Sequence, residues 1–255
     1  MDYTQFRIEK KDRIAVVTMR YGTMAHAFAD ELYELMRQLD QDEEIRVILL
    51  KNDGRFFCAG GDLSGSKPMS PNEFKRFIAN INRAIRQVRE TGKPVIALVN
   101  GAAAGGGCNL ALSCDLVLAS EKALFREVFV NVNAIPDTGG LWSLMRLIGA
   151  QKAKELCMTG RKVSPEEALE LGMITRIVPS EQLEEEGMKL ASDLAQKAPA
   201  AVTAIKHLCD RMPELTYQAY CDLESNIMGV LMSMNDTQEG KRAFMEKRAP
   251  IFTGK

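Results

Sequence analysis

Two glycine-rich segments are the first candidates for chemistry, because each would expose the main chain to a ligand. Residues 56–63 read FFCAGGDL and residues 100–110 read NGAAAGGGCNL. Glycine lets a ligand approach the main chain closely, and a turn that leads into a helix presents unpaired N–H groups to an anion. Two such turns could donate two hydrogen bonds to one oxygen atom and form an oxyanion hole. The alternative is that the glycines serve tight packing alone.

The composition argues against several other kinds of function. The 255 residues carry 33 Lys and Arg against 34 Asp and Glu, and this net charge of −1 argues against nucleic-acid binding through bulk electrostatics. The six cysteines form neither a C-x-x-C pair nor a Cys/His cluster, so we expect no metal site and no disulfide framework. With His26 and His207 as the two histidines, a Ser-His-Asp triad has few options. The N-terminus lacks the apolar stretch of a secretory signal, so we expect a cytoplasmic protein.

One charge-free stretch, Pro94 to Cys114, is long enough to cross a membrane. Its four glycines disfavour a spanning helix, since each costs about 1 kcal/mol relative to alanine. We therefore expect a buried strand, a glycine-rich turn and the start of a buried helix here, and no membrane segment.

The elements that must position these turns follow an α/β pattern, because short buried strands alternate with amphipathic helices and favour largely parallel sheets. The predicted strands are Phe6–Glu9, Ile14–Thr18, Val47–Leu50, Val95–Val99, Leu116–Ala119 and Ile174–Val178. The helices predicted between them are Ala29–Leu39, Glu73–Thr91 and Gly106–Ser113, and Asn52–Gly65 is expected to be irregular.

Helical periodicity dominates the chain after Gly139. The helices predicted there are Leu141–Ile148, Gln151–Met158, Pro165–Leu171, Leu183–Lys197, Ala200–Cys209, Leu215–Met234 and Thr237–Lys247. We therefore divide the chain into a core of residues 1–195 and a helical region of residues 196–255. The shape of this helical region would suit packing on another subunit.

In combination and in order, the motifs of this sequence resemble those of the enoyl-CoA hydratase/isomerase (crotonase) family. The match runs over nearly the whole chain. It includes both glycine-rich segments, SCDLVLA at 113–119, IPDTGG at 135–140, LCMTG at 156–160, ALELGMI at 168–174 and FMEKR at 244–248. The resemblance implies a right-handed spiral of repeated ββα units, closed by a C-terminal helical region that builds trimers, often paired into hexamers. It also implies an acyl-CoA thioester as substrate, with no permanently bound cofactor.

The resemblance assigns roles to particular residues. The backbone N–H groups of Gly61 and Gly106 would hold the thioester oxygen, an effect of about 3–4 kcal/mol per donor in comparable sites. The backbone around Ala59 and Gly60 would hold the CoA moiety. Lys247 would reach the CoA phosphates, partly across a subunit boundary.

The sequence departs from the hydratase pattern at both catalytic positions. Hydratases of this family use two glutamates that flank a water molecule, and this chain has Asn109 and Phe129 at those places. Neither side chain can accept a proton from water, so we do not expect hydration by the usual route.

One carboxylate remains in the right neighbourhood, that of Asp137, where family members that shift double bonds carry Asp or Glu. A single carboxylate suffices for an allylic shift, because it can remove a proton from one carbon and return it two carbons away while the oxyanion hole holds the dienolate. The apolar Phe129 would help to exclude water and could raise the pKa of Asp137. The alternative for Asp137 is an N-cap of the helix that follows.

Three hypotheses about function remain open. The leading one is an acyl-CoA isomerase with Asp137 as the proton shuttle. The second is a 2-enoyl-CoA hydratase that uses Glu127, which lies two residues before Phe129 and on the same face of an extended segment. The third is a non-catalytic acyl-CoA-binding protein that kept the fold.

Overall fold

A six-stranded sheet forms the centre of the molecule. The structure, a computed structural model, describes residues 3–25, 27–62 and 68–255, so His26 lies outside the described residues. The strands follow the order β1-β2-β3-β5-β7-β10, and every neighbouring pair is parallel except the β1–β2 hairpin. Their bounds are β1 Phe6–Lys11, β2 Ile14–Met19, β3 Val47–Asn52, β5 Val95–Val99, β7 Leu116–Ser120 and β10 Arg176–Val178.

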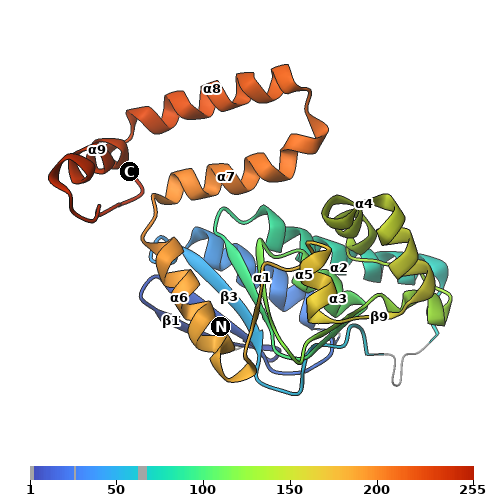
Figure 1. Cartoon of the computed structure of the whole chain (residues 1–255). Helices are drawn as coiled ribbons and strands as arrows, with labels where there is room; N and C mark the ends of the chain where they lie inside the picture. Colours follow the sequence, from blue (N-terminus) through green and yellow to red (C-terminus); the bar gives the residue numbers. More distant parts are fainter. Residues whose placement is uncertain (1–2, 26, 63–67) are drawn as a thin grey trace.

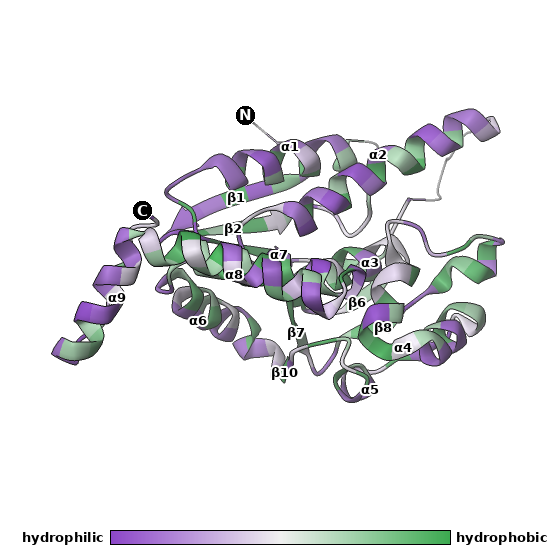
Figure 2. Cartoon of the chain, turned by 90° about the horizontal axis from the view of Figure 1, so that it is seen from above, coloured by the Kyte–Doolittle hydropathy of each residue, from purple (hydrophilic) through white to green (hydrophobic). Residues whose placement is uncertain are grey.

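Helices cover both faces of this sheet, which explains why its central strands are apolar at nearly every position. Alternate residues of β3 enter two different core clusters: Ile48 and Leu50 belong to one, and Val47 and Leu49 to the other. Helices α1 (Phe28–Gln41) and α2 (Pro71–Glu90) pack on each other, and Figure 2 shows their hydrophilic outer sides. Helix α6 (Leu183–Ala195) covers the opposite face.

A second, four-stranded sheet carries the glycine-rich turns, and the sequence analysis missed it. Its strands follow the order β4-β6-β8-β9, with β4, β6 and β8 parallel to one another. Their bounds are β4 Phe56–Cys58, β6 Ala102–Ala104, β8 Leu124–Arg126 and β9 Lys162–Val163. The expectation that residues 52–65 are irregular was therefore wrong for β4. Strands of two or three residues flanked by glycine have no periodicity of their own and form only through their neighbours.

Most predicted helices are present, with shifted ends. Helix α2 begins at Pro71 rather than Glu73, because Ser70 and Glu73 form a capping box that starts the helix earlier. The two helices expected on either side of Gly149 form α4 (Gly140–Thr159), which is broken at that glycine (φ 74°, ψ 163°). The shorter helices are α3 (Gly106–Leu112), α5 (Pro165–Glu170) and the 3₁₀ helix η1 (Val128–Val132). The late strand expected at Ile174–Val178 is shorter and begins at Arg176.

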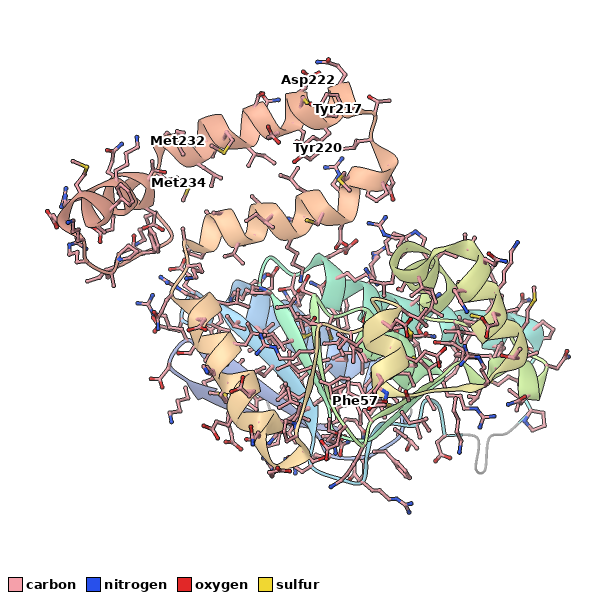
Figure 3. All side chains as sticks on the ribbon, in the orientation of Figure 1. Phe57, Tyr217, Tyr220, Asp222, Met232 and Met234 are labelled. Carbon is pink, nitrogen blue, oxygen red and sulfur yellow. The ribbon has the colours of Figure 1, made fainter. Side chains whose placement is uncertain are left out.

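The last three helices project from the core as one helical region. They are α7 (Pro199–Arg211), α8 (Tyr217–Ser233) and α9 (Asn235–Glu246), and Figure 1 shows α8 running beside α7 with α9 beyond them. Helix α8 buries none of its residues. Figure 3 shows Tyr217 and Tyr220 at the end of α8 that is remote from α9, and Met232 and Met234 at the other end. Among the described residues, no helix has the length and apolar character that crossing a bilayer requires.

An ion pair between a buried lysine and a partly exposed aspartate links α7 to the core. The Lys206 ammonium donates to the Asp115 carboxylate at 2.8 Å and to the carbonyl of Lys93 at 3.0 Å. The same carboxylate oxygen accepts the N–H of Val95 at 2.7 Å, so the pair joins α7 to the start of β5. Lys206 is only 8% exposed, and removing one partner of a buried pair leaves the other charge uncompensated.

Replacing this lysine tests its structural role. We expect Lys206→Met to lower the free energy of unfolding by about 1–3 kcal/mol, measured by urea denaturation, because the Lys93 carbonyl and the Asp115 carboxylate both lose their charged donor. The control is Lys189→Met, which removes a lysine whose side chain is 69% exposed and should change stability little. Adding Asp115→Asn to Lys206→Met should recover part of the loss. Equal stability of the two single lysine variants would contradict this role.

Candidate active site

Three parallel strand ends place the candidate residues at one edge of the second sheet. Strand β6 pairs with β4 on one side and with β8 on the other, so the carboxyl ends of all three strands lie together. The Gly60–Gly61 turn follows β4, the Gly105–Gly106 turn follows β6, and Glu127 follows β8. The sequence predicted that two turns could converge, and the pairing of strands that it missed explains why they do.

The two glycine turns touch main chain against main chain. A Cβ on Gly60 would lie 2.9 Å from the carbonyl oxygen of Ala104 and 3.2 Å from the nitrogen of Gly106. A Cβ on Gly107 would overlap the carbonyl of Cys58. Gly60 also has a φ of +88°, which side-chain-bearing residues rarely adopt. Tight packing therefore requires glycine at positions 60 and 107, and it brings the Gly60–Gly61 turn against Gly106.

Both candidate donor groups lack an acceptor in the part of the chain that the structure describes. Gly106 occupies the first position of α3, where an N–H has no intrahelical acceptor. In the described residues, no carbonyl or side chain accepts a hydrogen bond from the N–H of Gly106 or of Gly61. A Cβ on Gly61 would meet no atom within 4 Å, so space is open beside that turn. Two free donors on touching turns can bind one oxygen atom.

Asn109 serves as a structural link between α3 and the loop that precedes α4. Its side chain is fully buried, and its Nδ2 donates to the backbone carbonyl of Asp137 at 2.9 Å. A Cβ on Gly140 would overlap the Asn109 amide. This contact therefore requires glycine at the last position of the IPDTGG motif. Asn109 thus fixes the backbone that carries Asp137.

Asp137 does not cap α4. The N-cap position is Gly139, and no side chain caps this helix, so the N-cap alternative for Asp137 is wrong. One of its carboxyl oxygens, Oδ1, is buried and has no hydrogen-bond partner among the described residues. Burial raises the pKa of Asp137, and the adjacent Thr138 hydroxyl opposes that effect. A partly buried carboxyl with a raised pKa and a free oxygen suits proton transfer.

Glu127 is the most buried carboxyl of the site. Its side chain is 3% exposed, and neither Oε1 nor Oε2 has a hydrogen-bond partner in the described part of the chain. Burial raises the pKa of Glu127 to about 7, the charge of Asp137 raises it as well, and the Cys108 thiol lowers it. Glu127 and Asp137 therefore interact electrostatically.

Phe129 borders the glycine turn on the same side. A Cβ on Gly105 would lie 3.6–3.7 Å from the ring atoms Cζ and Cε2 of Phe129 and 3.4 Å from Val128. The ring is half-buried and closes this side of the Gly105–Gly106 turn with an apolar surface.

Of the three residues expected to contact CoA, Ala59 and Gly60 follow β4, whereas Lys247 lies apart from them after α9. The N–H of Ala59 donates to the carbonyl of Gly22 at 2.7 Å, and the carbonyl of Gly60 accepts the N–H of Met24 at 2.9 Å. Lys247 follows α9 with a φ of +55°, and Figure 1 shows that helix far from α3. Within one chain, Lys247 therefore does not reach the glycine turns.

Two residues at the site had no role in the sequence analysis. Cys108 faces Glu127 from α3, and burial raises the pKa of its thiol. Thr138 is buried and has a φ of +50°. Its hydroxyl lowers the pKa of Asp137. Cys108 lies in the GGGC motif and Thr138 in the PDTGG motif. The sequence does not show where their side chains point, because that depends on tertiary packing. The described residues contain no group of three His, Cys, Asp or Glu side chains that could hold a metal ion.

The comparisons with known proteins identify the family of this chain. A family model described as enoyl-CoA hydratase/isomerase matches residues 9–255. The 1,2-epoxyphenylacetyl-CoA isomerase of Escherichia coli is 35% identical over the full length of both chains. The short-chain-enoyl-CoA hydratase of Clostridium acetobutylicum is 32% identical over 97% of each.

Solved structures show the same fold. The enoyl-CoA hydratase of Bacillus anthracis superposes with a TM-score of 0.95 at 30% identity, over 99% of this chain and 100% of that one. The spiral of ββα units expected from the motifs is thereby confirmed. The chain has the crotonase fold and belongs to the enoyl-CoA hydratase/isomerase family of enzymes.

Proposed function

We propose that this protein is an acyl-CoA isomerase that moves a carbon–carbon double bond next to a thioester, with Asp137 as the proton shuttle. The observation that carries the proposal is Asp137 itself, a partly buried carboxyl with a free oxygen. Asn109 of α3, the helix that begins at Gly106, holds its backbone. The name of the E. coli relative shows that isomerisation of a CoA thioester occurs among similar proteins, there of an epoxyphenylacetyl-CoA.

The proposed reaction conserves protons and charge. The Asp137 carboxylate removes a proton from the carbon next to the thioester, and the negative charge moves onto the thioester oxygen. The N–H groups of Gly61 and Gly106 stabilise that oxyanion, which exists only in the transition state and the dienolate. Asp137, now a carboxylic acid, returns the proton two carbons further along the chain and becomes a carboxylate again.

A 2-enoyl-CoA hydratase is the second candidate, and Glu127 favours it. Glu127 is a second carboxyl that interacts with Asp137. Hydration needs one group to activate water and another to protonate carbon. Conversion of crotonyl-CoA and water into 3-hydroxyacyl-CoA, at a rate that falls in Glu127→Gln, would favour this candidate. The absence of that product during isomerase turnover would exclude it.

We also propose that residues 196–255 assemble the protein into trimers or pairs of trimers, with Lys247 contacting CoA bound to a neighbouring subunit. Phe244 and Met245 on α9 are 83% and 79% exposed, and Tyr217 on α8 is 83% exposed. Exposed apolar side chains of this size favour burial against another copy.

Sedimentation equilibrium tests the assembly. We expect a mass of three or six times the 28.3 kDa of the chain. Phe244→Glu should reduce that mass, because it places a charge on the proposed apolar contact. A monomer at micromolar concentration would contradict the proposal.

Asp137→Asn tests the proton shuttle. The amide keeps the size of the side chain but cannot accept a proton, so kcat for a 3-enoyl-CoA should fall by about 100- to 10,000-fold. The matched control is Glu170→Gln, an exposed carboxyl at the end of α5, which should leave kcat unchanged. Undiminished turnover in Asp137→Asn would remove Asp137 from the mechanism.

A pair of substitutions at Gly61 tests the backbone donor. Gly61→Pro deletes the N–H, whereas Gly61→Ala keeps it, and the added Cβ meets no described atom within 4 Å. We expect kcat of the proline variant to lie about 100- to 1,000-fold below that of the alanine variant. Circular dichroism should show that both variants fold. Equal rates in the two variants would mean that this N–H does not stabilise the oxyanion.

A further inference from the structure

Unpartnered oxygen atoms concentrate at the candidate active site. In the described part of the chain, seven buried side-chain atoms lack a hydrogen-bond partner, and five of them belong to four residues here. We call these five atoms the acceptor cluster: Asn109 Oδ1, Glu127 Oε1, Glu127 Oε2, Asp137 Oδ1 and Thr138 Oγ1. A buried acceptor without a donor costs about 1–3 kcal/mol, so a cluster of them indicates a functional requirement.

The cluster contains two carboxyl groups and no cation. The groups that act on Glu127 are the Cys108 thiol on α3 and the carboxyl of Asp137 in the loop before α4. Cys157 on α4 also faces Glu127, as a neutral thiol whose pKa is raised by burial and by the Glu127 charge. The nearest arginine in the sequence, Arg126, donates its Nε–H to the carbonyl of Gly160 at 2.6 Å instead.

Two carboxyls without a cation, one buried and one partly buried, cannot both be ionised at low cost, because each negative charge disfavours the other. The pair therefore retains a proton up to about pH 7. Glu127 is the more buried of the two groups, so its ionisation costs more free energy. Asp137 is partly open, and the Thr138 hydroxyl beside it favours its charged form.

We propose that Glu127 and Asp137 share one proton, which Glu127 holds while Asp137 exchanges a proton with the acyl chain. This inference rests on the proposed function of Asp137 as the shuttle. Glu127 is then a positioning residue, because it acts on the charge of Asp137 and not on the substrate. During turnover the pocket carries one negative charge, which moves from Asp137 to the thioester oxygen and back, and the Glu127 carboxyl stays neutral.

The shared proton predicts a coupling between the two carboxyls. The charge of Asp137 contributes to the pKa of Glu127, which is raised to about 7. Removing that charge should let Glu127 ionise at lower pH. An acyl group that displaces water from the pocket should have the opposite effect, because desolvation disfavours a second charge. Substrate therefore binds better to the singly charged pocket, and kcat/KM should fall above about pH 7.

Infrared spectroscopy of the unliganded protein tests the proposal without relying on activity. We expect a carboxylic-acid C=O band at about pH 6 that disappears by about pH 8, on either side of the ionisation near 7. The band should be absent in Glu127→Gln and should titrate at lower pH in Asp137→Asn. Glu170→Gln is the matched control and should leave the band unchanged.

The pH profile of kcat/KM supplies the second readout. The wild-type profile should fall about tenfold per pH unit above the Glu127 ionisation, and Glu127→Gln should lack that fall, because its amide stays neutral.

Several outcomes would overturn the shared proton. They are a missing band in the wild type, a band that persists in Glu127→Gln, and an unshifted titration in Asp137→Asn. If Glu127→Gln does not fold, the wild type and Asp137→Asn still decide the question. A shifted band together with full turnover in Asp137→Asn would instead uphold the coupling and reject the proposed shuttle.

Discussion

The site depends on one contact, the main-chain packing of the Gly60–Gly61 turn on the Gly105–Gly106 turn. A Cβ on Gly60 would press on the carbonyl of Ala104, and one on Gly107 would overlap the carbonyl of Cys58. Because glycine allows this approach, the two turns touch, and the N–H groups of Gly61 and Gly106 have no acceptor in the described chain. Donors held in this way need no reorganisation when charge develops on a bound oxygen, which is the physical basis of their catalytic effect.

The electrostatics of the pocket complement that contact. The donors favour one negative charge on the ligand, and the acceptor cluster on the other side contains two carboxyls with no cation. We propose that a neutral Glu127 keeps the total at one charge, while the half-buried ring of Phe129 covers the Gly105–Gly106 turn with an apolar surface. In our proposal, catalysis moves this charge across a short distance and does not create a second one.

The sequence predicted the large sheet, most helices and the two glycine turns, because long apolar runs and helical periodicity are strong local signals. It did not reveal β4, β6, β8 and β9, whose two or three residues form strands only through their neighbours. It also left Asp137 open as an N-cap, since an aspartate before a helix is typical of both roles. Asn109 was identified as a departure from the hydratase pattern, but its hydrogen bond to the Asp137 carbonyl and its contact with Gly140 depend on tertiary packing.

The central claim is that one carboxyl carries the proton between two carbons of the acyl chain. A single-turnover isomerisation of a 3-enoyl-CoA in D₂O, analysed by mass spectrometry, tests it most directly. A buried shuttle should return much of the proton that it removed, so the product should contain less than one deuterium per turnover at the γ-carbon. Complete labelling of that carbon from solvent in the first turnover would contradict a single-carboxyl shuttle.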